Sequence, residues 1–220
     1  MSYDGTIVKK PWGYEYLVYE NEDVGLWLLR IEPDQNTSMH CHPKKNTGLI
    51  VMRGEAEISF LNDKFNLKSP SKMMIRRGLF HSTKAISSDG VYLFEIETPK
   101  IKHDLVRLED NYGRENKPYE DANYEIGKNN NCLWLDDNSH KDGLKYFCGR
   151  LLKLIKASES DKILQCVKED DLLMAFKGGL TNEKDDPIYQ PGDVISGHIF
   201  KRLSQVFKLR EDSLILMISK

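Results

Sequence analysis

Three histidines in the first half of the sequence have a spacing that suits metal binding. His40 and His42 flank a single cysteine, and His81 follows further along the chain. Side chains at positions i and i+2 of an extended strand project to the same face. If a neighbouring strand brings His81 beside them, three imidazole nitrogens can hold one divalent cation, such as Zn, Mn, Fe or Ni. The sequence therefore predicts a metal site formed by His40, His42 and His81.

A barrel of short strands is required to bring these histidines together. Segments rich in β-branched and aromatic residues are separated by Pro, Gly, Asn and Asp turns, which is typical of an antiparallel sandwich or barrel. The segment from Glu55 to Phe60 alternates polar and apolar residues, the pattern of a strand with one solvated face. We therefore predict strands at 14–19, 25–31, 47–53, 55–61, 73–76 and 91–97.

The second half repeats this pattern after a polar, turn-rich stretch at 99–131. Further strands are expected within 149–158, 171–180, 193–200, 204–209 and 213–219. A Pro turn before an apolar strand occurs in both halves, and this weak internal repeat suggests a duplicated barrel. Arg202 stands in the second half where His81 stands in the first, so the second barrel is expected to lack the metal site. The predicted domains are an N-terminal barrel at 1–114, a linker at 115–131 and a degenerate barrel at 132–220.

Composition excludes several classes of protein. The formal net charge is −2, with 32 basic and 34 acidic side chains, and the absence of a basic stripe argues against nucleic acid. No apolar run of membrane-spanning length is present, and an acidic Asp4 stands where a signal peptide needs an apolar core, so we expect a cytoplasmic protein that does not bind membranes. The 4 cysteines lack the spacing of a disulfide scaffold or a zinc site.

The histidine spacing resembles that of the cupins, which are double-stranded β-helix, or jelly-roll, barrels. The first cupin motif is matched by His40, His42 and the strand-closing Gly54, and the second by Gly78 and His81. Thr47 departs from the pattern, because the family usually has a glutamate ligand at this position. The resemblance implies an all-β bicupin in which three imidazoles bind the metal without that carboxylate.

A narrower resemblance covers residues 9–114. The opening segment Lys10-Pro11-Trp12-Gly13-Tyr14-Glu15 is similar to the cupin domain of type II mannose-6-phosphate isomerases. So is the closing pair of segments, Phe94-Glu95-Ile96-Glu97-Thr98-Pro99 and the tail from Asp104 to Arg114. Besides Thr47, Glu97 replaces a Gln and Lys45 replaces an Arg of the family pattern. The departures lie near the expected site, which indicates an altered substrate or reaction.

The resemblance implies a sugar phosphate or nucleotide sugar as the small-molecule partner, and an isomerase or epimerase of carbohydrate biosynthesis. Such a reaction needs a base, an acid and an electrophile, the last supplied by the metal. Glu95, Glu97 or Glu57 is the expected base, depending on which strand face points inward. Lys45, assigned to catalysis and to substrate binding, is joined by Arg107 and Arg114 as a phosphate-binding group. The family resemblance also implies a homodimer.

Two other functions remain open from the sequence. A site of three histidines without a carboxylate resembles that of cupin-type thiol dioxygenases, which use Fe²⁺, and Thr47 would then suit the chemistry. Alternatively, the protein is a metal-free sugar-binding or regulatory cupin, in which the degenerate second barrel reflects a loss of catalysis. Metal content, oxygen uptake and ligand-induced stabilisation without turnover distinguish these hypotheses.

Overall fold

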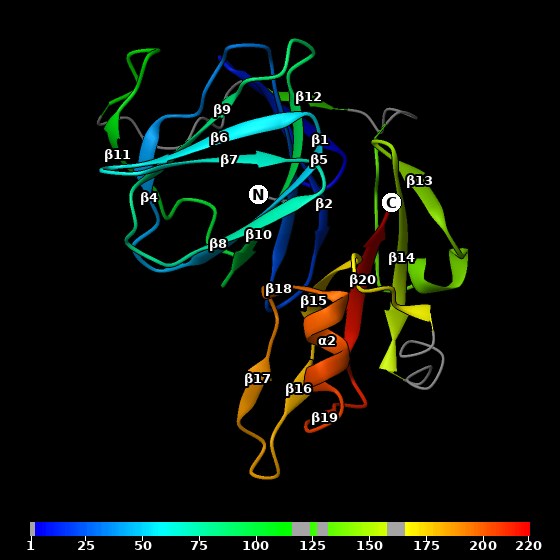
Figure 1. Ribbon diagram of the computed structural model, residues 1–220. Helices are drawn as coiled ribbons and strands as arrows, with labels where there is room; N and C mark the ends of the chain where they lie inside the picture. Colours follow the sequence, from blue (N-terminus) through cyan, green and yellow to red (C-terminus); the bar gives the residue numbers. More distant parts are fainter. Residues whose placement is uncertain (1–2, 116–123, 127–131, 158–165) are drawn as a thin grey trace. The chain divides into compact units, whose positions relative to one another are not determined.

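A computed structural model describes residues 3–115, 124–126, 132–157 and 166–220 of the chain. The chain divides into two compact units, one comprising Met1–Glu20 and Gly25–Trp134 and the other Asn21–Val24 and Leu135–Lys220. Almost all regular structure in the described parts is β-strand, which confirms the all-β prediction (Figure 1). None of the helices in these parts is long and apolar enough to cross a membrane.

The first unit is a jelly-roll barrel of two antiparallel sheets. Its strands are β1 (Thr6–Lys10), β2 (Gly13–Glu20), β3 (Gly25–Ile31), β4 (Met39–Cys41), β5 (Asn46–Arg53), β6 (Glu55–Phe60), β7 (Lys64–Lys68), β8 (Ser71–Ile75), β9 (His81–Ala85), β10 (Val91–Thr98), β11 (Val106–Glu109) and β12 (Tyr124–Ile126). Within the described residues, a seven-stranded sheet has the order β12-β1-β2-β3-β10-β5-β8 and a five-stranded sheet the order β11-β4-β9-β6-β7. Side chains of both sheets meet in one apolar cluster, which includes Leu93 and Val51 from the first sheet and Ile58 from the second.

The inward face of the barrel changes from apolar at one end to polar at the other. On β10 the alternating positions Val91 and Leu93 lie in the apolar core, whereas Glu95 and Glu97 line a cavity. Strand β5 runs antiparallel to β10, so its inward face is polar at its start and apolar further along. Thr47 pairs with Glu97 at the polar end, and Val51 pairs with Leu93 in the apolar core. The apolar end stabilises the barrel by burying its side chains, and the polar end can therefore serve a ligand.

The strands predicted for the first half are confirmed, with small differences at their ends. The linker predicted at 115–131 falls mostly outside the described residues. Its described segment Tyr124–Ile126 forms β12 and pairs with β1 in the seven-stranded sheet. Three residues are too few to show an alternating pattern, so this strand could not be recognised in the sequence.

The second unit contains β13 (Lys145–Phe147), β14 (Arg150–Lys156), β15 (Leu172–Lys177), β16 (Leu180–Thr181), β17 (Pro187–Tyr189), β18 (Val194–Ser196), β19 (Lys208–Leu209) and β20 (Leu214–Ser219), with a 3-10 turn η1 (Ser139–Asp142) and a helix α2 (Gly197–Leu203). Its described strands form one sheet of order β13-β14-β20-β15-β18 and a smaller one of order β17-β16-β19. The expected second cupin barrel is not confirmed by this arrangement.

The strand predicted within 193–200 is confirmed only at Val194–Ser196. Strand β18 ends at Ser196, whose side chain accepts a hydrogen bond from the backbone N–H of Ile199 and begins helix α2. A serine hydroxyl at this position satisfies a backbone donor that the first helical turn leaves without a partner. Phe200 then anchors the helix in the core of the second unit. Arg202, which the sequence aligns with His81, lies in α2.

Candidate metal centre

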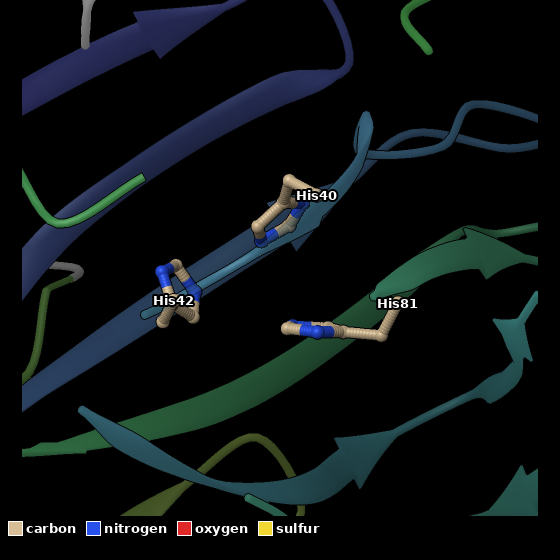
Figure 2. A group of neighbouring side chains, drawn as sticks. All are labelled: His40, His42 and His81. Atoms are coloured by element: carbon tan, nitrogen blue, oxygen red, sulfur yellow. The ribbon is translucent and has the colours of Figure 1, made fainter. Parts of the chain in front are cut away.

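The three histidines predicted from the sequence lie together on the five-stranded sheet. His40 lies on β4, His42 follows at its end, and His81 begins β9, where it is the direct partner of His40. The ring centroids are 4.5 Å apart for His40 and His81, 4.9 Å for His40 and His42, and 5.5 Å for His42 and His81. Figure 2 shows the three rings grouped around a common space. One possible ligand atom from each ring lies within 4.8 Å of the others.

A backbone carbonyl fixes the orientation of each ring. The Nδ1 atoms of His40, His42 and His81 lie 2.7, 2.6 and 3.0 Å from the carbonyl oxygens of Ser38, Asp104 and Leu79. A carbonyl can only accept a hydrogen bond, so Nδ1 of each histidine must carry the proton and donate it. The Nε2 atom of each ring therefore has a free lone pair. This outer hydrogen bond is the arrangement that orients histidine ligands at metal sites.

Burial keeps the three imidazoles neutral. Burial, followed by the proximity of the other two rings, holds the pKa of His40 well below its usual value. Burial and then the Lys45 ammonium lower the pKa of His42 to about 2, and burial lowers that of His81 to about 4. A neutral imidazole is the form that binds a metal ion. No protonation change is therefore needed before this group can bind a cation near neutral pH.

The residues present fit a divalent cation. The Nε2 atom of His42 is buried and has no hydrogen-bond partner in the described structure, although buried polar atoms are rarely left without one. A metal ion would satisfy this lone pair together with those of His40 and His81. Three imidazole nitrogens suit Zn²⁺, Fe²⁺ and similar ions and leave coordination positions open for other ligands.

Lys45 and Glu97 form a buried ion pair beside the histidines. Lys45 Nζ lies 2.5 Å from Glu97 Oε1, and the two side chains are only 1% and 3% exposed. Asp104 holds the turn that carries Lys45, because its carboxylate accepts hydrogen bonds from the backbone N–H groups of Lys44 and Lys45 at 2.8 and 3.1 Å. The carbonyl of Asp104 also orients His42, so this residue links the metal centre to the ion pair.

Glu95 lies in the same cavity and is the candidate base whose pKa is shifted most clearly. Burial and the neighbouring Glu97 carboxylate raise the pKa of Glu95 to about 7. Glu57, the third candidate, is excluded: it pairs with Lys64 at 2.9 Å and alternates with Ala56 and Ile58, which face the core. The structure thus decides which glutamates face the cavity.

Both predicted arginines line the cavity. Arg107 on β11 is the direct partner of His40 on β4, so its side chain shares the face that carries the metal centre. Arg114 is engaged by Asp110 through two hydrogen bonds, Nη2 to Oδ1 at 2.6 Å and Nε to Oδ2 at 3.0 Å. This ion pair orders the segment after β11 and uses much of the hydrogen-bonding capacity of Arg114.

Sequence reasoning missed a second group of charges in the cavity. Lys102 Nζ lies 2.8 Å from Glu15 Oε1 and 3.4 Å from the ring centroid of Trp27. Burial acts to lower the pKa of the Lys102 ammonium, but the carboxylates of Glu15 and the two cavity glutamates outweigh it and raise that pKa. A signal for Glu15 was its place between Tyr14 and Tyr16, on a strand that is buried through most of its length. Lys102 lies in a polar segment without a periodic pattern, so no sequence signal indicated it. Asp104 was recognised only as the first residue of the tail that resembles the family.

Comparisons with known proteins agree with this geometry. Residues 3–110 match the protein family described as mannose-6-phosphate isomerase C-terminal. No curated protein matches the sequence.

Three similar solved structures each match less than half of this chain. KdgF from Halomonas sp. is 15% identical with a TM-score of 0.40, over 42% of this chain and 84% of that one. An uncharacterised Klebsiella pneumoniae protein with a double-stranded β-helix domain is 20% identical with a TM-score of 0.40, over 44% and 84%. The capsular polysaccharide assembling protein CapF from Staphylococcus aureus is 16% identical with a TM-score of 0.42, over 47% and 34%.

The family match, the jelly-roll sheets and the histidine group all lie in the first unit. Residues 3–110 therefore form a cupin domain of the mannose-6-phosphate isomerase C-terminal type.

Proposed function

We propose that the first unit binds one divalent cation through His40, His42 and His81 and catalyses proton transfer on a sugar phosphate or nucleotide sugar, as an isomerase or epimerase. The observation that carries this proposal is the shared cavity. Three neutral imidazoles with oriented Nε2 atoms and a glutamate with a pKa of about 7 belong to one end of the barrel. A small-molecule partner and a homodimer remain predictions.

Each cavity residue has a role that its surroundings support. The cation, when bound, supplies a Lewis acid that polarises a carbonyl oxygen. Glu95 removes and returns the proton, because a base is most effective when its pKa lies near the working pH. Glu97 and Lys45 are held together at 2.5 Å, so they present a fixed donor and acceptor to the substrate hydroxyls. Arg107, which shares a face with His40, binds the anionic group of the substrate.

Deuterium incorporation tests this proposal across a panel of candidate substrates. Aldose phosphates, ketose phosphates and nucleotide sugars are incubated in D₂O with the Zn²⁺-, Mn²⁺- or Fe²⁺-loaded protein, and mass spectrometry detects deuterium on the carbon next to the carbonyl. We expect incorporation with at least one substrate, its loss in Glu95→Gln, and its retention in Glu57→Gln, whose side chain pairs with Lys64 away from the cavity. Failure of every substrate and metal to incorporate deuterium contradicts the proposal.

An oxygenase is the second candidate. It is favoured by one observation, namely that the histidine group in the described residues includes no carboxylate. Three neutral ligands suit Fe²⁺ that binds a thiolate substrate. Oxygen consumption by the Fe²⁺-loaded protein with small thiols, and none with the Zn²⁺-loaded protein, would favour this function over the isomerase.

A further inference from the structure

The charge around the three histidines is unusually positive for a buried metal centre. In the described part of the chain, the only group of possible ligands consists of three imidazoles, which carry no charge when they bind. The carboxylates of Glu95 and Glu97 line the same cavity. The Lys45 ammonium at 2.5 Å already balances Glu97, and the Lys102 ammonium acts on Glu95. A bound divalent cation would therefore keep both of its positive charges in a largely buried site. Such a charge is costly unless an anion accompanies it.

Thr47 lies on the inward face of β5 toward this end of the barrel. Positions 49 and 51 of the same strand, Leu49 and Val51, belong to the core of the barrel, and the alternation of a strand places Thr47 on their face. Thr47 is also the direct partner of Glu97, which lines the cavity. Direct partners in an antiparallel pair project to one face of the sheet.

The hydroxyl of Thr47 has no partner in the described protein. The residue is only 1% exposed, and its Oγ1 atom makes no hydrogen bond. A buried hydroxyl without a partner destabilises the fold, whereas a hydrogen bond to a ligand removes that cost. His42 Nε2 is unsatisfied in the same way. Two such atoms at the polar end of one barrel indicate that a ligand from outside the protein completes the site.

We propose that this ligand is an anion that binds the cation through two oxygens on neighbouring atoms, as a deprotonated 2-hydroxycarbonyl or a 2-hydroxycarboxylate unit does. The Thr47 hydroxyl recognises this anion. The inference rests on the metal site of the proposed function and narrows its substrate class. Three imidazoles would leave positions on a bound cation for two oxygens of such a ligand. The ligand's negative charge offsets the excess positive charge, and Thr47 provides a neutral hydrogen-bonding group where a carboxylate would compete with the anion.

The test uses the whole chain loaded with Co²⁺ and two probes, acetohydroxamate and acetate. Acetohydroxamate is an anion that chelates through two oxygens on neighbouring carbon and nitrogen atoms. Acetate is an anion of similar size whose two oxygens belong to the same carbon. Visible absorption reports the Co²⁺ environment, calorimetry gives the affinities, and gel filtration shows that the Co²⁺ remains on the protein. We expect acetohydroxamate to bind the loaded protein at least about tenfold more tightly than acetate, because its second oxygen binds intramolecularly.

Substitutions at Thr47 test its role directly. Thr47→Val removes the hydroxyl at nearly constant shape and is expected to weaken acetohydroxamate binding about fivefold, the effect of one hydrogen bond. Thr47→Glu is expected to change the Co²⁺ spectrum, tighten Co²⁺ binding and weaken acetohydroxamate binding further. Thr98→Val is the matched control: the Thr98 Oγ1 is also buried without a partner, but this residue follows Glu97 and projects to the opposite face. It should leave both affinities unchanged.

Each failure has a distinct meaning. If the protein does not bind Co²⁺, or if His42→Gln binds it equally well, the proposed metal site and this inference are both wrong. If Co²⁺ binds through the histidines but acetohydroxamate shows no preference over acetate, the inference is wrong and the proposed function stands. Equal behaviour of Thr47→Val and Thr98→Val overturns the role of Thr47.

Discussion

The buried ion pair between Lys45 and Glu97 makes a sharp prediction about stability. At 2.5 Å, the attraction of two unit charges is about 7 kcal/mol for an effective dielectric constant of about 20. The loss of solvation of both ions offsets much of this attraction. Lys45→Met removes the ammonium and leaves the Glu97 carboxylate buried without its partner, a change that typically lowers the free energy of unfolding by about 3–5 kcal/mol. Lys102 also acts on Glu97 electrostatically, so we expect a value near the lower end, about 3 kcal/mol.

The assay is urea unfolding followed by tryptophan fluorescence. The chain has 3 tryptophans, and Trp12, Trp27 and Trp134 all belong to the first unit, so the signal reports on the unit that contains the pair. Replacement of both partners, Lys45→Met with Glu97→Met, should recover most of the loss, because no unpaired charge remains.

An exposed pair at similar distance provides the control. Lys64 Nζ and Glu57 Oε1 are 2.9 Å apart, but their side chains are 66% and 25% exposed. Lys64→Met should therefore cost less than about 1 kcal/mol. If Lys45→Met costs no more than Lys64→Met, or if the double substitution costs the sum of the two single ones, then burial does not strengthen the coupling of Lys45 and Glu97.

Three further predictions concern protonation, metal binding and the loop at Asp104. Because the pKa of Glu95 is raised from 4.5 to about 7, its protonated form favours folding, and this contribution is lost as the pH rises through that interval. The free energy of unfolding of Glu95→Gln relative to the unsubstituted protein should therefore increase between pH 4.5 and 7 in urea titrations, and a constant difference contradicts the shift. Zn²⁺ at a hundred times its dissociation constant should raise the free energy of unfolding by about 2.7 kcal/mol, measured by thermal melts. The His42→Gln protein should show no such rise. An equal rise in this variant excludes His42 as a ligand. Asp104→Ala should lower the free energy of unfolding by about 2–3 kcal/mol, because two backbone N–H groups lose a charged acceptor. It should also weaken metal binding about tenfold, because His42 loses its fixed orientation. An unchanged metal affinity in calorimetry rules out this second effect.

Local sequence patterns were sufficient to predict the barrel of the first unit and its histidines. Alternation along a strand is fixed by the backbone itself, so His40 and His42 had to share a face wherever the strand lay. The turns and alternating segments predicted β2, β3, β5, β6, β8 and β10, but not β4 and β9, the short strands that carry His40 and His81. A helix of only two turns was missed, because its start depends on the Ser196 hydrogen bond and its anchoring on the burial of Phe200 in the second unit.

The choice among the glutamates and the partners of the charged residues depended on the tertiary structure. Glu57, Glu95 and Glu97 all lie on alternating strands, and only the register of those strands decides which side chains face the cavity. Lys45 and Glu97 are 52 positions apart and meet at 2.5 Å, and the carbonyl that orients His42 comes from Asp104, 62 positions away. The sequence alone determined which residue types could bind a metal. Contacts between distant strands decided how those residues are oriented, paired and charged, because these properties arise only when the sheets close around the cavity.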